Sequence, residues 1–219
     1  MSAPSRRGTI TLRDGARVTL RPVEPLDKPL LAASFERLSE ESRYTRFFTV
    51  KNELSAAELD YLVDVDHSDH EAIIAVDPSS GEVLGVARYV RATDGAEVAE
   101  VAVTVADDWQ GRGLGRAPAS RLTYRARREG VHRFTALVQS DNRASLALVE
   151  GIGDTRRGVD GGEVELVIEL PPSGAWGHGS SAPCGRRLPE AWFRLKHSRT
   201  APPLAWDPRR AIREPRSTR

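Results

Sequence analysis

Gln110-Gly111-Arg112-Gly113-Leu114-Gly115 lies between an apolar run, Val101–Val105, and a run that predicts a helix from Arg116. Glycines at every second position let the backbone approach a ligand closely and adopt φ values that other residues resist. A helix that begins directly after this loop points its free N–H groups and the positive end of its dipole into the loop. The strand, loop and helix N-terminus therefore predict a site for a phosphorylated ligand.

Two common phosphate-binding motifs do not fit this loop. The P-loop needs a Lys and a Ser or Thr directly after its last glycine, but here Arg116 and Ala117 follow Gly115. The dinucleotide fingerprint needs the spacing G-x-G-x-x-G, whereas this loop has G-x-G-x-G. A turn that binds no ligand is the alternative in a chain with 18 glycines.

Charge and composition divide the chain of 219 residues into two parts. Residues 171–219 carry ten Lys or Arg and three Asp or Glu, a net charge of +7, which leaves −6 on residues 1–170. The apolar residues of this Pro- and Arg-rich tail follow no period of 2 or 3.6, so we expect it to be disordered. We also expect a flexible N-terminus over residues 1–7 and one domain with a sizeable core over residues 8–170.

Several classes of protein are disfavoured by what the chain contains. The single cysteine, Cys184, excludes an internal disulfide framework and a CxxC metal site. The chain has neither a signal-peptide pattern at its start nor an apolar run long enough to span a membrane, so we expect a cytoplasmic protein without a membrane partner. The basic residues of the tail are scattered among prolines, which favours a solvated tail over a nucleic-acid site.

Periodicity and turn residues predict an α/β fold with a mixed, mostly antiparallel sheet flanked by helices. Asp14-Gly15 marks a hairpin between its first two strands. The other predicted strands are Ala72–Val76, Val83–Arg91, Glu97–Val105, Arg133–Val138 and Glu163–Leu170. The predicted helices are Asp27–Leu38 with Asp27 as its cap, a helix from the capping box at Ser55 through Val63, Arg116–Glu129, and Asn142–Glu150.

The loop from Gln110 to Gly115 resembles the Q-x-x-G-x-G acyl-CoA pyrophosphate loop of the GCN5-related N-acetyltransferases, the GNAT family. The element order over residues 8–170 is similar to that fold. The segment Ser42–Phe48, followed by a capped helix, resembles the bacterial protein-lysine acetyltransferase subgroup. The resemblance implies acetyl-CoA as co-substrate, no metal, and direct transfer to an amine, with a protein lysine as the acceptor. A small amine acceptor and an acyl-CoA-binding module without catalysis are the alternatives.

The resemblance also implies how the acyl-CoA is held. The family's two central strands part near the loop, so the backbone after Glu100 would pair with the pantetheine arm as an added strand does. The backbone N–H groups of Gly111 to Arg116 and the guanidinium groups of Arg112 and Arg116 would bind the pyrophosphate. Asn142 fits either a pantetheine contact or a plain helix cap. The implied acyl-CoA ligands are Val103, Thr104, Val105, Gln110, Gly111, Arg112, Gly113, Leu114, Gly115, Arg116 and Asn142.

Glu100 is the candidate general base, because its place matches the glutamate that the family uses. A lysine ammonium has a pKa near 10.4 and must lose a proton before the nitrogen can attack. The strand pattern alone favours a solvated side chain for Glu100, and only the resemblance raises it to a candidate base; Glu97 is the second candidate base. A one-residue bulge in this strand would change which glutamate faces the cleft.

Three positions depart from the family pattern and support the reading as a weakened enzyme. Val149 stands where many members have the Tyr that protonates the leaving thiolate, and Tyr89 and Tyr124 are not placed by any motif. Asp154 follows Gly153 where an aromatic residue is usual, and Pro118 lies early in the loop helix, where it could kink that helix.

A cluster of acidic and histidine side chains follows the second helix. It comprises Asp64, Asp66, His67, Asp69 and His70. No matching group of ligands occurs elsewhere, so the spacing favours a solvated loop over a metal site.

Overall fold

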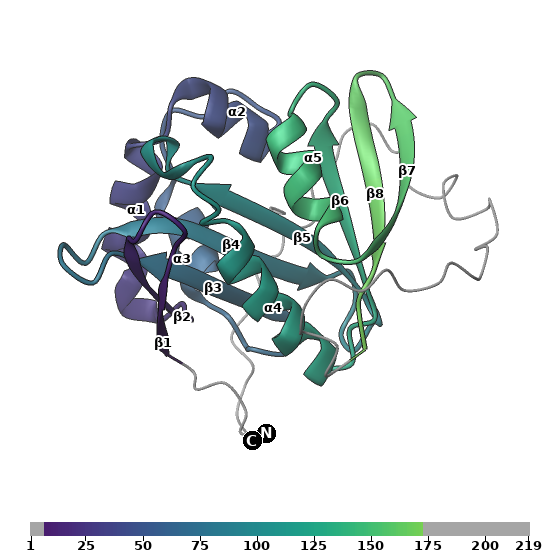
Figure 1. Cartoon of the computed structure of the whole chain (residues 1–219), viewed down its shortest axis with the longest axis horizontal. Coiled ribbons are helices and arrows are strands. Elements are labelled where there is room, and N and C mark those ends of the chain that lie inside the picture. The colour runs from purple at the N-terminus through teal and green to yellow at the C-terminus, as the bar shows by residue number, and fades with distance from the viewer. Residues whose placement is uncertain (1–6, 173–219) are drawn as a thin grey trace.

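The computed structural model describes residues 7–172 of the chain. The predicted tail therefore lies, apart from residues 171 and 172, outside the described residues, as do residues 1–6 of the predicted N-terminus. A single sheet of eight strands runs through the molecule in the order β1-β2-β3-β4-β5-β6-β8-β7 (Figure 1). The strands are β1 Gly8–Thr11, β2 Arg17–Pro22, β3 His70–Val76, β4 Val83–Arg91, β5 Val98–Val105, β6 Arg133–Gln139, β7 Asp154–Asp160 and β8 Glu163–Glu169.

Five α-helices accompany the sheet in the described part of the chain. They are α1 Lys28–Glu36, α2 Glu40–Phe47, α3 Ala56–Val63, α4 Arg116–Arg128 and α5 Arg143–Glu150, with short 3-10 turns η1 Pro25–Asp27 and η2 Asp107–Trp109. Neighbouring strands are antiparallel except for β5 and β6, which are parallel. The predicted α/β fold with a mixed, mostly antiparallel sheet is confirmed. No helix among residues 7–172 is long and apolar enough to cross a membrane.

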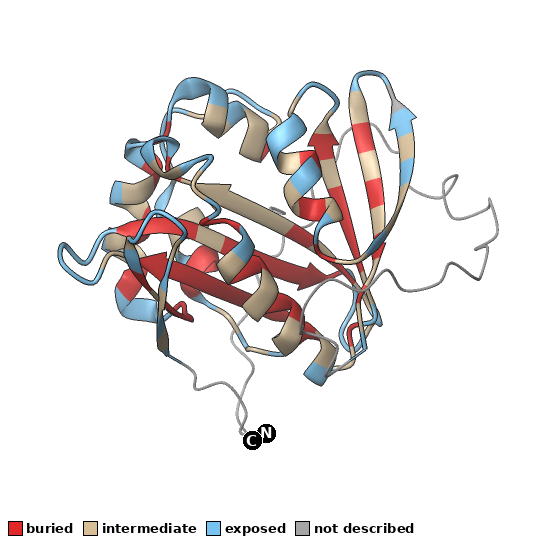
Figure 2. Cartoon of the chain, in the orientation of Figure 1, coloured by how far each residue is buried: buried red, intermediate tan, exposed pale blue. Residues whose placement is uncertain are grey.

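Two apolar cores form because the two faces of the sheet carry different sets of side chains. On one face Ile73 and Tyr89 pack with Leu122 of α4, and on the other Ile74 packs in a cluster with Phe35 of α1 and Phe47 of α2. Strands β3 and β4 are buried along most of their length, because helices cover both faces (Figure 2). The central strands therefore form a rigid support for the strand that follows, β5.

The cap expected of Asp27 is replaced by a buried ion pair. The Asp27 side chain makes no cap hydrogen bond; it accepts two bonds of 2.6 Å from the Arg21 guanidinium and one of 2.7 Å from the N–H of Glu24. The carboxylate therefore joins β2 to η1. At the third helix the predicted capping box is present, since the side chains of Ser55 and Glu58 each accept a bond from the other's backbone N–H.

Two elements were missed by the sequence pattern. The helix α2 buries only Phe47, so it shows no apolar stripe, and it ends where Phe48 takes a left-handed conformation with φ 53°. The edge strand β7 has the sequence DTRRGVD, whose charges hide its strand character. Both elements owe their conformation to neighbours: β7 pairs along its whole length with β8, and α2 lies beside β5.

Pro118 does not interrupt α4. The helix begins at Arg116 after the cap residue Gly115, so Pro118 is its third residue. The first i to i−4 bond runs from the N–H of Ala119 to the carbonyl of Gly115. Because the N–H groups of the first turn have no partner within a helix, the proline removes no helix bond.

Candidate active site

The sheet splits between β5 and β6. Their parallel ladder has three pairs only, the last being Glu100 opposite Thr135, while β6 continues to pair with β8 as far as Gln139 (Figure 1). The N–H of Ala106, directly after β5, donates to the carbonyl of Leu84 in β4, so the backbone of Ala106 faces β4. Because backbone polar groups alternate in direction along a strand, those of Val105 and Val103 face away from β4, toward the split. The predicted parting of the central strands is thus present, with backbone polar groups of β5 turned toward it.

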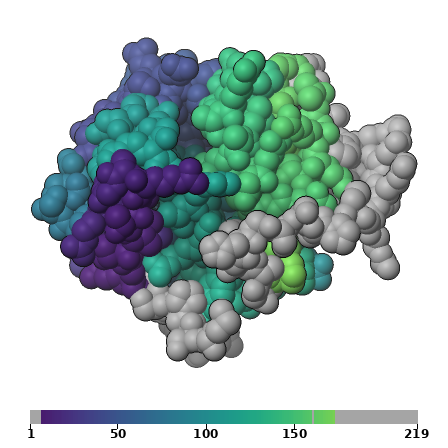
Figure 3. Space-filling view, in the orientation of Figure 1, coloured from purple at the N-terminus to yellow at the C-terminus, as the bar shows by residue number. Residues whose placement is uncertain are grey.

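A cavity of about 880 Å³ occupies the split. Its walls come from β5, the glycine loop, α2, the end of β6 and the start of α5, and Figure 3 shows the hollow between the regions of α2 and α5. Nearly all of the predicted site residues line it: Glu100, Val103, Thr104, Val105, Gln110, Gly111, Gly113, Leu114, Gly115, Arg116 and Asn142. Arg112 is the exception.

The glycine loop has the free N–H groups that a phosphate needs. Gly111 and Gly113 take φ values of 70° and 82°, a region that side chains disfavour. The backbone N–H groups of residues 111–115 make no hydrogen bond within the described part of the chain. The N–H of Arg116, which we expected to join them, instead donates to the carbonyl of Gly113 over 3.3 Å. Five N–H groups and the N-terminus of α4 are therefore available for an anion.

The two arginines of the loop differ in their placement. The Arg112 side chain lies outside the cavity, where its Nε donates to Asp14 over 2.5 Å and its guanidinium stacks 3.9 Å from the centre of the Trp109 ring. The hydrogen bond from the N–H of Ala16, and secondly the one from Arg112, lower the pKa of the Asp14 carboxyl. Arg116 lines the cavity and is exposed. Arg116 is thus the better placed of the two for a phosphate.

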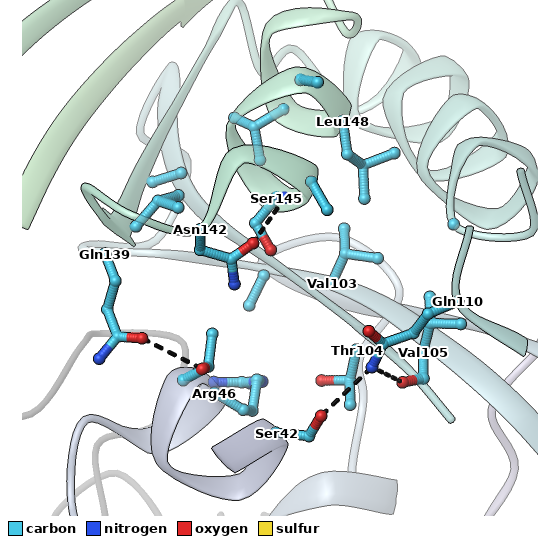
Figure 4. A pocket seen from close by; sticks show the side chains of 18 of the residues that line it. Ser42, Arg46, Val103, Thr104, Val105, Gln110, Gln139, Asn142, Ser145 and Leu148 are labelled. Atoms are coloured by element: carbon cyan, nitrogen blue, oxygen red, sulfur yellow. Dashed lines mark hydrogen bonds between the residues drawn. The ribbon is translucent and has the colours of Figure 1, made fainter. Parts of the chain in front are cut away.

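Asn142 caps α5 and keeps a side-chain donor that could serve a ligand, so both of its predicted roles remain compatible with the structure. Its Oδ1 accepts the N–H of Ser145 over 2.9 Å and so caps α5. Its Nδ2 makes no hydrogen bond within residues 7–172 and lies on the cavity side of the side chain (Figure 4). The cap fixes the side chain, and a donor is left for a ligand carbonyl.

Glu100 lies where the ladder ends, on the sheet face that α2 adjoins. The β4–β5 register runs without a bulge from Gly85 opposite Val105 to Arg91 opposite Ala99, so Glu100 shares its face with Val90 and not with its neighbour Val101. Glu97, the second candidate base, precedes β5, is exposed and does not line the cavity. Of the two glutamates, only Glu100 faces the site.

Arg46 of α2 is a cation in the same cavity that sequence reasoning had not assigned. Burial lowers the pKa of its guanidinium, and attraction to the Glu100 carboxylate opposes that effect. Behind it, burial and the charge of Arg46 lower the pKa of Arg88 to about 9. Arg88 donates to His70 over 2.5 Å and to the carbonyl of Leu62 over 2.8 Å. The cavity wall thus contains both signs of charge, at Arg46 and Glu100.

The helix α2 bridges the two sides of the split, which no motif predicts. The hydroxyl of Thr45 donates to Gln139 at the end of β6 over 3.1 Å. On the β5 side, Gln110 Nε2 lies 3.2 Å from Ser42 Oγ and 3.2 Å from the carbonyl of Val105 (Figure 4). Thr45 and Gln139 are 94 positions apart in the sequence, and Ser42 and Gln110 are 68 apart, so no local pattern could have predicted these two contacts.

The departures from the family pattern leave the cavity without a tyrosine from the described residues. Val149 is buried and lines the wall. Tyr89 is buried elsewhere, with its hydroxyl donating to Ser68, and burial raises its pKa. Neither Tyr89 nor Tyr124 lines the cavity. Asp154 is exposed at the start of β7, away from the cavity.

The acidic and histidine cluster forms a structured turn before β3. Asp66 Oδ1 accepts the N–H groups of Ser68, Asp69 and His70 over 2.8 to 2.9 Å. Our expectation of a solvated loop was wrong for His70, which is 8% exposed because Arg88 and Tyr61 pack against it. Within residues 7–172 no group of three His, Cys, Asp or Glu is arranged to hold a metal ion.

Comparison with known proteins agrees with this geometry. The acetyltransferase (GNAT) domain model matches residues 17–155. The acetyltransferase Pat of Mycolicibacterium smegmatis is 36% identical over 163 residues, 74% of this chain and 49% of that protein, so the chain spans about half the length of this relative. A Pseudomonas aeruginosa acetyltransferase of L-methionine sulfoximine and L-methionine sulfone is 38% identical over 84 residues, 37% of this chain and 49% of that one.

Among solved structures, the GNAT domain of S. lividans PAT superimposes with a TM-score of 0.70 at 31% identity, covering 77% of this chain and all of that domain. The match of the family model to more than half of the residues, the split sheet and the glycine loop lead to one conclusion: the chain belongs to the GNAT family of acetyltransferases.

Proposed function

We propose that this GNAT acetyltransferase moves the acetyl group of acetyl-CoA onto a protein lysine side chain, by direct attack in a ternary complex with Glu100 as general base. The observation that carries the proposal is the place of Glu100, at the last pair of the β5–β6 ladder and in the wall of the cavity. Family membership supports the acetyl transfer. The resemblance of Ser42–Phe48 to the protein-lysine acetyltransferase subgroup supports the lysine.

One set of residues would bind the acetyl donor, acetyl-CoA, and another would receive the amine acceptor. The free N–H groups of residues 111–115 and Arg116 would bind the pyrophosphate, and the backbone of Val103 and Val105 would pair with the pantetheine arm. This would place the thioester near the point where the strands part. The acceptor would enter from the side of α2, past Arg46, toward Glu100.

The reaction needs one proton acceptor and one good leaving group. The lysine ammonium gives a proton to Glu100, directly or through water, and the neutral nitrogen attacks the thioester carbon. The N–C bond forms, the C–S bond breaks and the sulfur leaves with the electron pair. The second proton on nitrogen is released to solvent. Because Val149 supplies no acid, the sulfur leaves as a thiolate, which a thiol pKa near 8.5 makes tolerable.

Replacement of Glu100 by Gln tests this assignment. We expect kcat/KM for the acceptor to fall by about 10²- to 10⁴-fold, the usual contribution of a general base, while calorimetry gives an unchanged Kd for acetyl-CoA. Glu97→Gln, on the same segment but outside the cavity, should retain activity. Equal turnover by wild type and Glu100→Gln would remove Glu100 from the mechanism. Tight acetyl-CoA binding without transfer to any amine would identify an acyl-CoA-binding module instead.

A small acceptor that carries both an amine and a carboxylate is the second candidate, and Arg46 favours it. Its guanidinium lines the cavity opposite Glu100, so an amino acid could place its carboxylate at Arg46 and its amine at Glu100. The relative that acts on methionine sulfoximine is of this kind. Parallel assays with lysine-containing proteins and with free amino acids separate the two candidates, and Arg46→Gln should impair only the use of amino acids.

A further inference from the structure

Asp107 connects two parts of the site that lie far apart in the sequence. It belongs to η2, between β5 and the glycine loop. Its Oδ2 accepts the N–H of Ser39, the cap residue of α2, over 2.6 Å. Its Oδ1 accepts the Ser42 hydroxyl, and also Gln110 Nε2 over 2.9 Å. One carboxylate thus holds the start of α2 and the first residue of the acyl-CoA loop.

We propose that Asp107 is a positioning residue, which fixes α2 against the acyl-CoA loop and so shapes the part of the cavity where the amine acceptor would bind. The inference rests on the acetyl transfer proposed above and adds a residue to it. Asp107 acts through α2, which contributes Thr45 and Arg46 to the acceptor side of the cavity.

Asp107 anchors the first turn of α2, whereas Phe47 and Arg43 hold the helix to α1 and to the segment that follows it. The helix has eight residues, too few for a stable helix in isolation, and Phe47 is its one buried residue. Its side chains also bond to Gln139 through Thr45, to Gln110 through Ser42, and to the carbonyls of Glu36 and Asn52 through Arg43, but within residues 7–172 only the bonds to Asp107 and Gln110 join it to the acyl-CoA loop and η2. A carboxylate at a helix N-terminus is also favoured by the helix dipole. Loss of Asp107 should therefore displace the first turn of α2 without unfolding the sheet.

Gln110 supplies the link to acyl-CoA. Its Nε2 carries two hydrogens but has three acceptors within reach: the carbonyl of Val105, Ser42 Oγ and Asp107 Oδ1. The carbonyl of Val105 faces the split. A ligand N–H that bonds to this carbonyl leaves both hydrogens of Gln110 for Ser42 and Asp107. Binding of acyl-CoA should then strengthen the bonds from Gln110 to Ser42 and Asp107, and so hold α2 more firmly.

Asp107→Ala is the test, and Asp108→Ala is its matched control. Asp108 is the next residue of η2, is exposed and carries the same charge, but it makes no hydrogen bond within residues 7–172. We expect Asp107→Ala to raise the acceptor KM about tenfold or more, as the loss of charged hydrogen bonds implies, with the Kd of acetyl-CoA within twofold of wild type. Asp107→Asn, which keeps one acceptor oxygen, should lie between. Asp108→Ala should match wild type.

Hydrogen exchange of residues 39–48 gives a readout that needs no turnover. Acetyl-CoA should slow exchange of this segment in wild type and in Asp108→Ala, but not in Asp107→Ala. Ser42→Ala provides a second variant, and its effect should not add to that of Asp107→Ala. Equal exchange in all variants, additive effects, or equal losses of acetyl-CoA and acceptor binding would overturn the inference. If wild type transfers to no amine, the proposed function fails, while exchange still decides whether Asp107 anchors α2.

Discussion

Gly115→Ala should distort the cavity, because the added methyl group displaces two side chains that line it. Gly115 caps α4 with φ −58°, a value open to any residue, so an alanine brings no backbone strain. An added Cβ would lie 3.0 Å from Leu148 Cδ2 and 3.3 Å from Val105 Cγ2, and both side chains line the cavity. Carbon atoms normally meet at about 3.5 to 4.0 Å, so the Leu148 side chain must move by roughly half an ångström and that of Val105 by a few tenths.

Overpacking of this kind costs about 1 to 3 kcal/mol. In a domain of this size each kcal/mol lowers the melting temperature by roughly 2 to 4 °C. We therefore expect a melting temperature lower by about 2 to 12 °C in differential scanning calorimetry. Because Val105 belongs to the free edge of β5, the shift should also weaken acetyl-CoA binding about tenfold, the equivalent of 1.4 kcal/mol, in isothermal titration calorimetry.

Leu148→Ala supplies the control. In the double variant the 3.0 Å contact no longer exists, so Gly115→Ala should cost less there than in wild type, a favourable coupling in the double-mutant cycle. The reasoning is refuted if Gly115→Ala melts and binds acetyl-CoA as wild type does, or if the two substitutions add without coupling.

Three further predictions follow from single contacts. Asn142→Ser should keep the α5 cap and the melting temperature but lose acetyl-CoA affinity, whereas Asn142→Ala should lose affinity and about 1 kcal/mol of stability as well; matched losses in both variants would contradict the separate donor role. Gly153→Ala should destabilise by about 3 kcal/mol or more in urea unfolding, because its Cβ would lie 2.1 Å from the backbone oxygen of Glu169, and a wild-type midpoint would contradict this. Burial tends to raise the pKa of Asp66, but three backbone N–H bonds lower it below its ordinary value. The stability that this carboxylate contributes is thus complete above about pH 4 and lost as pH falls through its folded pKa, so the stability gap between wild type and Asp66→Ala should close in acid and stay constant from pH 5 to 7.

Elements whose own residues carry a periodic signal were predictable. The strands β3 to β5 have long apolar runs, and the capping box at Ser55 marks the start of α3 within one residue. The helix α2 and the strand β7 were not, because each is polar and is held by a partner distant in the chain. Asp27 is a single-residue example. It does stand at the N-cap position of α1, as predicted, but its carboxylate binds Arg21 and not the helix backbone.

The candidate site divides in the same way. The residues proposed to bind acyl-CoA were chosen mostly from a contiguous motif, and apart from Arg112 the structure places them around one cavity. The contacts of α2 were not predictable, because nothing near Asp107 or Gln139 in the sequence marks them as its neighbours. Arg112 was assigned to phosphate by its place in the motif, but Asp14, 98 positions away, binds its side chain.

The short ladder between β5 and β6 also has a mechanical consequence. Strands β1 to β5 and strands β6 to β8 form two plates that meet along three residue pairs, so this seam is the weakest line across the sheet. A ligand that pairs with the free edge of β5 lengthens the seam. Acetyl-CoA bound there would hold the two parts of the sheet together. At a hundred times its Kd, a ligand of the folded state adds about 2.7 kcal/mol to the free energy of unfolding, so we expect acetyl-CoA to raise the resistance of the whole sheet to heat and proteases.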